Sequence, residues 1–217
     1  MGKETTWSQT LEREGEPVLE LSMVLPAPEE TGPGGVRMAR YYRRLGELWR
    51  ARWTERLYPR ACAALEEARA GSRTFRPWRA SLVYRTAWTD EELASLWVDA
   101  TEVRDKGRPL TVRTAGTWRR ETGDLLKLPD VLPGRRGWRR QVLEEVRRQI
   151  GARLASGESL LYADAAERAA AQFSPRRFYL TEEGPVLFYP MYALGSPAEG
   201  IPVFSLTGKK IFPPEKT

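Results

Sequence analysis

A long run of helical spacing, followed by short extended segments, limits the folds open to this chain more than any other feature. Between Val36 and Ala70, apolar residues recur three or four positions apart, which predicts an amphipathic helix. Pro59 lacks the backbone N–H that a helix interior needs, so we expect it to kink or divide the run. Ala61–Ala70 is then a second helical piece.

Extended segments lie on both sides of this helical run. Residues 16–25 alternate in a way that predicts a strand with one well-buried face, and residues 26–35, with three prolines and three glycines, predict a loop. Three further segments are short, are rich in β-branched and aromatic residues and are separated by polar turns: Trp78–Ala87, Leu93–Val103 and Leu110–Trp118. They predict a meander of antiparallel strands.

The second half of the chain predicts one more long helix and then a return to strands. Gly137–Leu154 carries apolar residues at intervals of four, and Ala163–Gln172 is a shorter alanine-rich helix. Residues 178–189 predict a hairpin that turns at Gly184, and Val203–Leu206 a last strand. We therefore predict an α+β fold in which an antiparallel sheet, meander plus C-terminal hairpin, packs against two main helices. The expected division is residues 1–75 and 76–217, joined in one compact unit.

The composition excludes several classes of enzyme and metal protein. The chain has no histidine and one cysteine, Cys62. It therefore has no Ser-His-Asp or Cys-His catalytic pair, no histidine-ligated metal and no internal disulfide. We expect no cofactor and no catalytic activity. An enzyme would have to work with carboxylates, tyrosine or lysine alone.

The basic charge is spread along the chain. Lys+Arg number 35 against 29 Asp+Glu, and six lysines leave 29 arginines, interleaved with acidic residues from Arg13 to Arg177. This spread favours diffuse surface charge over a groove for nucleic acid. A cytoplasmic arginine-rich module that binds nucleic acid or an acidic protein partner stays open as the alternative function.

Neither a secretory signal nor a membrane span is predicted. Met1–Thr10 has no apolar stretch, and the longest uncharged stretch, Pro185–Ala198, is shorter than the roughly 20 residues a span needs. As written, the chain is expected to be cytoplasmic, or extracytoplasmic if its true N-terminus is missing.

Two regions near the C-terminus are candidates for binding. Tyr179, Tyr189 and Tyr192, with Phe178 and Phe188, form an aromatic cluster that serves either as core or as a docking face. The loop Tyr192–Pro202 serves either as a structural corner or as a ligand loop. Asp99, Asp124 and Asp130 are separated in sequence, but they could converge at one end of the meander.

Residues 178–206, FYLTEEGPVLFYPMYALGSPAEGIPVFSL, resemble the C-terminal signature of a bacterial domain family of unknown function, DUF3298. Its members include the extracytoplasmic parts of RsiV-type anti-sigma factors, which recognise lysozyme, and modules that accompany PdaC-type deacetylases. Weaker similarities lie at Ser95–Ala100, at 117–130 and, for the PdaC-like N-terminal region, at Gly15–Leu19 and Tyr41–Tyr42. Together they cover most of the chain.

The resemblance implies a non-catalytic recognition domain whose partner is a lysozyme-like protein or a peptidoglycan-derived glycan. The chain departs from the family at two turns, 103–109, where a histidine is missing, and 195–197. The loops Val103–Leu110 and Tyr192–Pro202 would then be displayed from a sheet backed by the Trp138–Leu154 helix. The predicted binding residues are Tyr179, Tyr189, Tyr192, Ser196, Pro197, Arg104 and Lys106.

Overall fold

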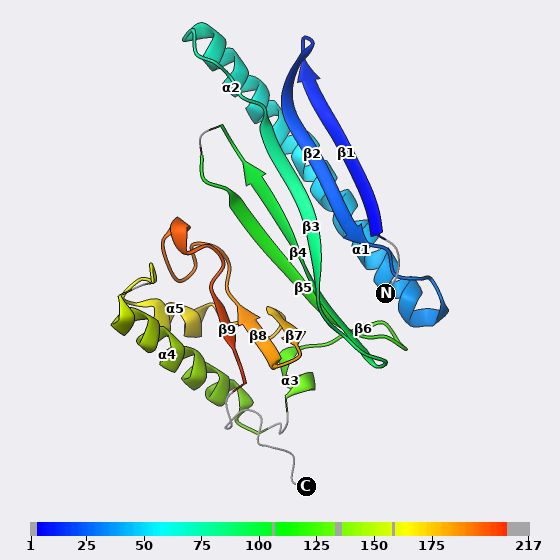
Figure 1. Cartoon of the computed structure of the whole chain (residues 1–217), viewed down its shortest axis with the longest axis vertical. Helices are drawn as coiled ribbons and strands as arrows, with labels where there is room; N and C mark the ends of the chain where they lie inside the picture. Colours follow the sequence, from blue (N-terminus) through cyan, green and yellow to red (C-terminus); the bar gives the residue numbers. More distant parts are fainter. Residues whose placement is uncertain (1–3, 106, 133–135, 158, 208–217) are drawn as a thin grey trace. The chain divides into compact units, whose positions relative to one another are not determined.

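Two β-sheets and several helices make up an α+β fold, as predicted (Figure 1). The computed structural model describes residues 4–105, 107–132, 136–157 and 159–207. The strands are β1 (Glu4–Arg13), β2 (Glu16–Pro26), β3 (Trp78–Thr89), β4 (Leu93–Val103), β5 (Leu110–Arg119), β6 (Asp124–Leu125), β7 (Phe178–Thr181), β8 (Gly184–Phe188) and β9 (Val203–Ser205). The helices are α1 (Gly32–Arg52), η1 (Trp53–Leu57), α2 (Tyr58–Ala70), α3 (Leu128–Val131), α4 (Trp138–Ser156), α5 (Ala165–Ala171) and the single turn η2 (Pro197–Glu199).

The larger sheet has six strands in the order β1-β2-β3-β4-β5-β6, and the smaller one has the order β7-β8-β9. β1–β2, β5–β6, β7–β8 and β8–β9 pair antiparallel. β2 and β3 pair parallel, with Leu19 opposite Trp78 and Val24 opposite Val83. The chain between these two strands forms α1, η1 and α2, because parallel neighbours need a long crossover.

The chain folds into two compact units that share the long strands. Unit 1 contains residues 1–84, 98–112 and 121–123, and unit 2 contains residues 85–97, 113–120 and 124–217. The division of the chain into domains at residue 75 stays a prediction.

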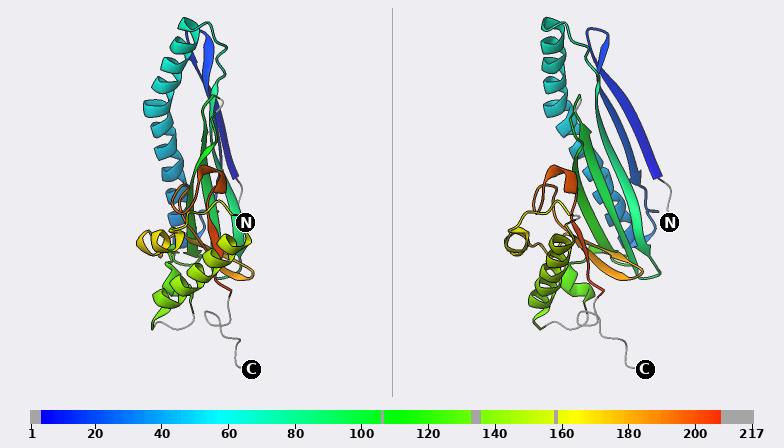
Figure 2. Two further views of the ribbon diagram at one scale, coloured as in Figure 1. Left: turned by 90° about the vertical axis from the view of Figure 1, so that its left-hand side faces the viewer. Right: turned by 60° about the vertical axis from the view of Figure 1, so that its left-hand side comes forward.

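In unit 1, α1, η1 and α2 lie along one face of β1, β2 and the first part of β3 (Figure 2). The helices bury Met38, Tyr42, Trp53, Leu57 and Leu65, each at most 6% exposed. Alternate residues of β2 are buried as well, as the strand pattern predicts. The N-terminal run therefore forms the core of unit 1 with one face of the sheet.

The predicted break in this helical run is a π-helical turn, η1, directly before Pro59. Its hydrogen bond joins the N–H of Tyr58 to the carbonyl of Trp53, five residues back. Pro59 has no N–H for the carbonyl of Glu55, so the α-helical pattern cannot continue across this point. The wider turn also suits the spacing of the buried residues. Side chains spaced by exactly four residues move around the axis of an ordinary α-helix by about 40° at each step, and a wider turn reduces this movement.

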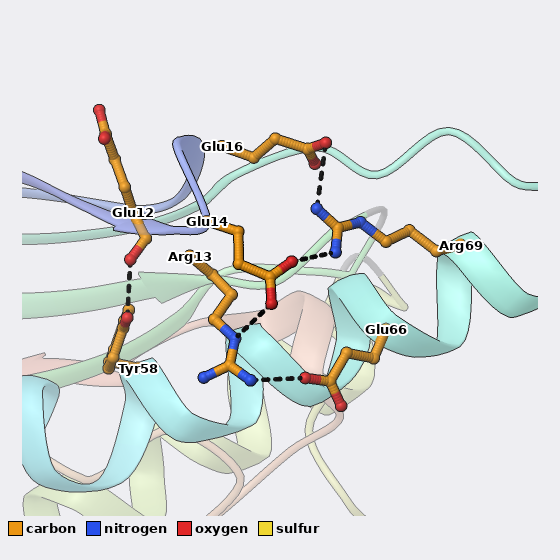
Figure 3. Close-up of polar contacts among 7 residues, drawn as sticks. All are labelled: Glu12, Arg13, Glu14, Glu16, Tyr58, Glu66 and Arg69. Carbon is orange, nitrogen blue, oxygen red and sulfur yellow. Dashed lines mark hydrogen bonds and ion pairs between the residues drawn. The ribbon is translucent and has the colours of Figure 1, made fainter.

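Exposed ion pairs fix the tip of the β1–β2 hairpin to α2 (Figure 3). Arg69 pairs with Glu14 at 2.9 Å and with Glu16 at 3.2 Å, and Arg13 pairs with Glu66 at 3.3 Å. The hydroxyl of Tyr58 donates a hydrogen bond to the carbonyl of Glu12 at 2.7 Å. Because these ion pairs are exposed to water, each is expected to contribute little to the stability of the fold.

In unit 2, α4 and α5 pack against the small sheet. One face of α4 buries Val142, Val146 and Ile150 in the same cluster as Phe178 and Phe204. Gln149 and Arg153 of α4 donate hydrogen bonds to backbone carbonyls of β9, at 2.7 Å to Ser205 and 2.6 Å to Val203. The helix predicted over 137–154 therefore backs the three-stranded sheet that the predicted hairpin begins.

The structure differs from the sequence predictions at the N-terminal end. β1 was not predicted, and α1 begins at Gly32, inside the segment predicted as a loop. β1 has no buried residue to mark it, and Pro33 is well suited to a first helical turn, where no N–H partner is needed.

No described helix has the length and apolar character that crossing a bilayer requires.

Candidate functional site

The loop from Pro190 to Pro202, called the 190–202 loop below, is held against the segment 160–162 of unit 2. The N–H of Tyr162 donates to the carbonyl of Leu194 at 2.8 Å, and that of Ser196 to the carbonyl of Leu160 at 2.9 Å. In return, the N–H of Leu160 donates to the Glu199 carboxylate at 2.7 Å. A loop with this many backbone contacts has a fixed shape, although only three of its residues are in a regular turn.

Tyr192 is an exposed aromatic residue of this loop. It lies in a turn closed by the N–H of Ala193 and the carbonyl of Pro190 at 3.0 Å, and its φ is 68°. A side chain at such a φ costs roughly 1–2 kcal/mol compared with ordinary backbone. Its side chain is nevertheless large, aromatic and 43% exposed. Strain at an exposed aromatic residue is a feature that functional loops retain.

The other predicted residues of this loop are less accessible. Ser196 and Pro197 are half-buried, and they begin the short turn η2. Gly195 precedes them, and a side-chain carbon there would lie 2.7 Å from the carbonyl oxygen of Leu160. The 190–202 loop therefore needs glycine at this point in order to stay in contact with the 160–162 segment.

Tyr179 and Tyr189 lie in the interior of unit 2. Tyr179 is 7% exposed, and its ring centroid is 4.5 Å from that of Trp97. Tyr189 is 1% exposed and donates its hydroxyl to the carbonyl of Ala169 at 3.0 Å. Burial raises the pKa of Tyr189 well above the usual range of tyrosine. The guanidinium of Arg113 lies over the Trp97 and Tyr179 rings, at 4.9 and 5.9 Å from their centroids.

Arg104 lies in unit 1, directly after β4. Its guanidinium donates to the Glu102 carboxylate at 2.7 Å and lies over the ring of Trp78, 5.6 Å from the centroid. Lys106 lies outside the described residues. Four of the predicted binding residues are thus at least partly accessible: Arg104 in unit 1, and Tyr192, Ser196 and Pro197 in unit 2.

The structure adds a recess in unit 1 that the sequence did not predict. It has a volume of about 180 Å³ and is lined by Arg52, Arg56, Leu57, Arg60, Glu102 and Arg104. We call it the arginine recess. Glu102 is a buried carboxylate, 4% exposed, and it pairs with Arg52 at 3.5 Å as well as with Arg104. The spacing of the three helical arginines was visible in the sequence, but their proximity to the end of β4 was not.

A second cavity in unit 1 has a volume of about 580 Å³. Its lining combines aromatic side chains, Phe75 and Trp78, with charged ones, Glu67, Arg73, Arg76 and Asp105. The indole N–H of Trp78 is buried, and no acceptor among the described residues binds it. Buried donors of this kind are rare in folded proteins.

Asp130, which the sequence singled out, and Glu145 on α4 both serve local structure. Asp130 accepts a hydrogen bond from the N–H of Lys127 at 2.7 Å and so caps α3. Glu145 binds Arg148 at 2.6 Å on α4, which lowers the pKa of Glu145. Within residues 4–207, excluding 106, 133–135 and 158, no three acidic or cysteine side chains are grouped as a metal ion would require.

Solved structures of DUF3298 proteins have a similar fold. A DUF3298 family member from Bacteroides fragilis matches with a TM-score of 0.61 at 13% sequence identity, over 94% of this chain and 88% of its own. A DUF3298 family protein from Pseudomonas aeruginosa matches with a TM-score of 0.54 at 14% sequence identity, over 94% of this chain and 88% of its own. No protein-family model and no curated protein matches the sequence. The fold is therefore that of these DUF3298 structures.

Proposed function

We propose that this chain is a non-catalytic recognition domain of the DUF3298 type and that the 190–202 loop contacts its ligand. One observation carries the proposal: Tyr192 is held in a strained backbone conformation with 43% of its surface exposed. Tyrosine is favoured at protein-binding sites because it brings a large rigid surface with few rotatable bonds. A loop fixed by backbone hydrogen bonds loses little conformational entropy on binding, which favours affinity.

The proposed ligand is a cell-wall-associated protein, with lysozyme as the first candidate and a peptidoglycan-derived glycan as the second. Two observations support this class. Residues 178–206 resemble the signature of RsiV-type proteins, and 94% of the chain aligns with a solved DUF3298 structure. The altered turn at Gly195–Pro197 lies beside Tyr192, so this chain is expected to bind its ligand through contacts of its own.

The test is a titration of the purified chain with lysozyme and, separately, with soluble muropeptides. Tyr192→Gly removes the aromatic side chain and suits the backbone, so it should fold normally and weaken binding by more than tenfold. Leu48→Ala is the matched control, because it removes an apolar side chain of similar exposure, 53%, from α1 in unit 1.

Two results would count against the proposal. If neither ligand bound or stabilised the chain thermally at high excess, the proposed class of ligand would be wrong. Equal affinity of the wild type and Tyr192→Gly would remove the role of the 190–202 loop.

A further inference from the structure

The arginine recess carries more positive charge than its own carboxylate neutralises. Arg52, Arg56, Arg60 and Arg104 bring four positive charges against the single negative charge of Glu102, which leaves three in excess. Glu102 pairs with Arg52 and Arg104 only. In the part of the chain that the structure describes, no carboxylate pairs with Arg56 or Arg60.

Other arginines of unit 1 show the contrast. Arg69, on the same helix as Arg60, binds Glu14 and Glu16 (Figure 3). Arg43 on α1 binds Glu30 at 2.7 Å. Like charges four residues apart on one helix face destabilise the helix. Arg52, Arg56 and Arg60 are spaced in this way and all three line one recess. An anionic ligand would relieve this repulsion.

The π-helical turn contributes to this arrangement. In an ordinary α-helix, side chains spaced by exactly four residues move around the axis by about 40° at each step. The wider turn over Trp53–Leu57 reduces this movement between Arg52 and Arg60, so that both line the recess. Such turns inside α-helices are frequent at functional sites.

We infer that the arginine recess binds one phosphate group. The volume of about 180 Å³ is enough for a phosphate group with part of its hydration. It is smaller than the ~300 Å³ at which pockets for whole drug-sized ligands begin. A phosphate monoester carries close to two negative charges, and guanidinium groups bind its oxygens in pairs. The phosphate is either free or the end of a small ester whose remainder stays outside the recess.

This inference is independent of the proposed function. The recess belongs to unit 1, and the 190–202 loop belongs to unit 2. Loss of one binding activity would leave the other testable on the same protein.

The experiment is calorimetric titration of the whole chain with inorganic phosphate and with glycerol 3-phosphate, at constant ionic strength set by chloride. We expect saturable binding of one phosphate per chain. Arg56→Gln and Arg60→Gln should each weaken binding about tenfold or more, because each removes a charged hydrogen-bond donor. Arg40→Gln is the control: Arg40 is an exposed arginine of α1 that does not line the recess, so its variant should bind within twofold of the wild type.

Melting curves without phosphate show whether the variants fold. Tighter binding of glycerol 3-phosphate would identify an ester as the ligand, and equal or tighter binding of inorganic phosphate would identify the free anion. Lack of saturable binding, or equal losses in Arg40→Gln and Arg60→Gln, would overturn the inference. So would tight, salt-sensitive binding of a single-stranded oligonucleotide that inorganic phosphate does not displace, since it would indicate a nucleic-acid surface.

Discussion

The backbone N–H of Leu180 donates a hydrogen bond of 2.7 Å to the hydroxyl oxygen of Ser95, 85 residues earlier in the chain. Ser95 is completely buried on β4, and its hydroxyl lies 2.8 Å from that of Thr117 on β5. Leu180 is in β7, which pairs with β8 on one side only. One serine hydroxyl thus joins the small sheet of unit 2 to two strands of the large sheet.

Ser95→Ala should lower the free energy of unfolding by about 1–3 kcal/mol, because the Thr117 hydroxyl and the Leu180 N–H both lose their partner. Urea unfolding followed by circular dichroism would measure the change. Thr101→Val is a control on the same strand, because the Thr101–Thr111 contact of 3.0 Å is only half-buried and should cost less than ~1 kcal/mol. Equal losses in the two variants would contradict the role given to Ser95.

Gly195→Ala and Gly151→Ala should change stability in opposite directions. At Gly195 the added carbon would lie 2.7 Å from the backbone oxygen of Leu160, which cannot move without opening the loop, so a loss of about 1–3 kcal/mol is expected. At Gly151, within α4, nothing lies within 4 Å, and alanine should add about 0.5–1 kcal/mol through its higher helix propensity. Thermal melting of both variants would test the pair.

The ion pairs at the tip of the β1–β2 hairpin should weaken in acid. The pKa of Glu14 is lowered by its hydrogen bond with Arg69 and, after that, by the charges of Arg69 and Arg13. A lowered pKa in the folded state stabilises the protein above the unfolded pKa of about 4.3, and this contribution disappears as the pH falls through the folded value.

Glu14→Gln should therefore be less stable than the wild type at pH 7 and equal to it in strong acid, as measured by urea unfolding at a series of pH values. Glu182→Gln is the control, since this exposed glutamate has no ion pair with any described residue. A difference between Glu14→Gln and the wild type that does not change with pH would rule out the ion pair as its cause.

The buried hydroxyl of Tyr189 should make stability fall in alkali. Its pKa is raised by burial, so the unfolded chain releases the proton first, above pH ~10, and unfolding becomes easier as the pH rises further. Tyr189→Phe should cost ~1 kcal/mol near pH 8, through loss of the hydrogen bond to Ala169. The gap between the variant and the wild type should narrow between pH 9 and about 11. If the difference in the free energy of unfolding between the variant and the wild type did not change with pH, the pKa of Tyr189 would be the same in the folded and unfolded chains.

The local elements of this fold were predictable from the sequence, because their signals are local. The strands predicted at 78–87, 93–103 and 110–118 agree with β3, β4 and β5 to within two residues, and Gly184 has the positive φ, 124°, expected at the hairpin turn. β1 was missed because it is an edge strand whose residues are mostly exposed, and its two half-buried apolar residues, Trp7 and Leu11, are four apart. Strand patterns depend on alternation, which such a strand does not show.

The parallel pairing of β2 with β3 has no local signal, since it brings together residues about 59 positions apart, such as Leu19 and Trp78. The arginine recess depends on the same long-range arrangement. Its helical arginines are visible as a spacing, but Glu102 and Arg104 reach them only through the fold. Of the predicted site residues, Tyr192 has the exposure a binding residue needs, whereas Tyr179 and Tyr189 are buried. Both faces of the small sheet are covered, because Tyr189 packs in one apolar cluster and Tyr179 in another.

Because of the π-helical turn, the number of residues between positions 53 and 57 matters for the orientation of α2 as much as the side chains there. A helix rotates by about 100° per residue, so deletion of one residue in this turn would remove its extra residue and would rotate all of α2 about its axis. Arg60 would leave the recess, and Arg69 would leave its glutamates at the hairpin tip. A single-codon deletion here is therefore expected to be more harmful than most substitutions at the same positions.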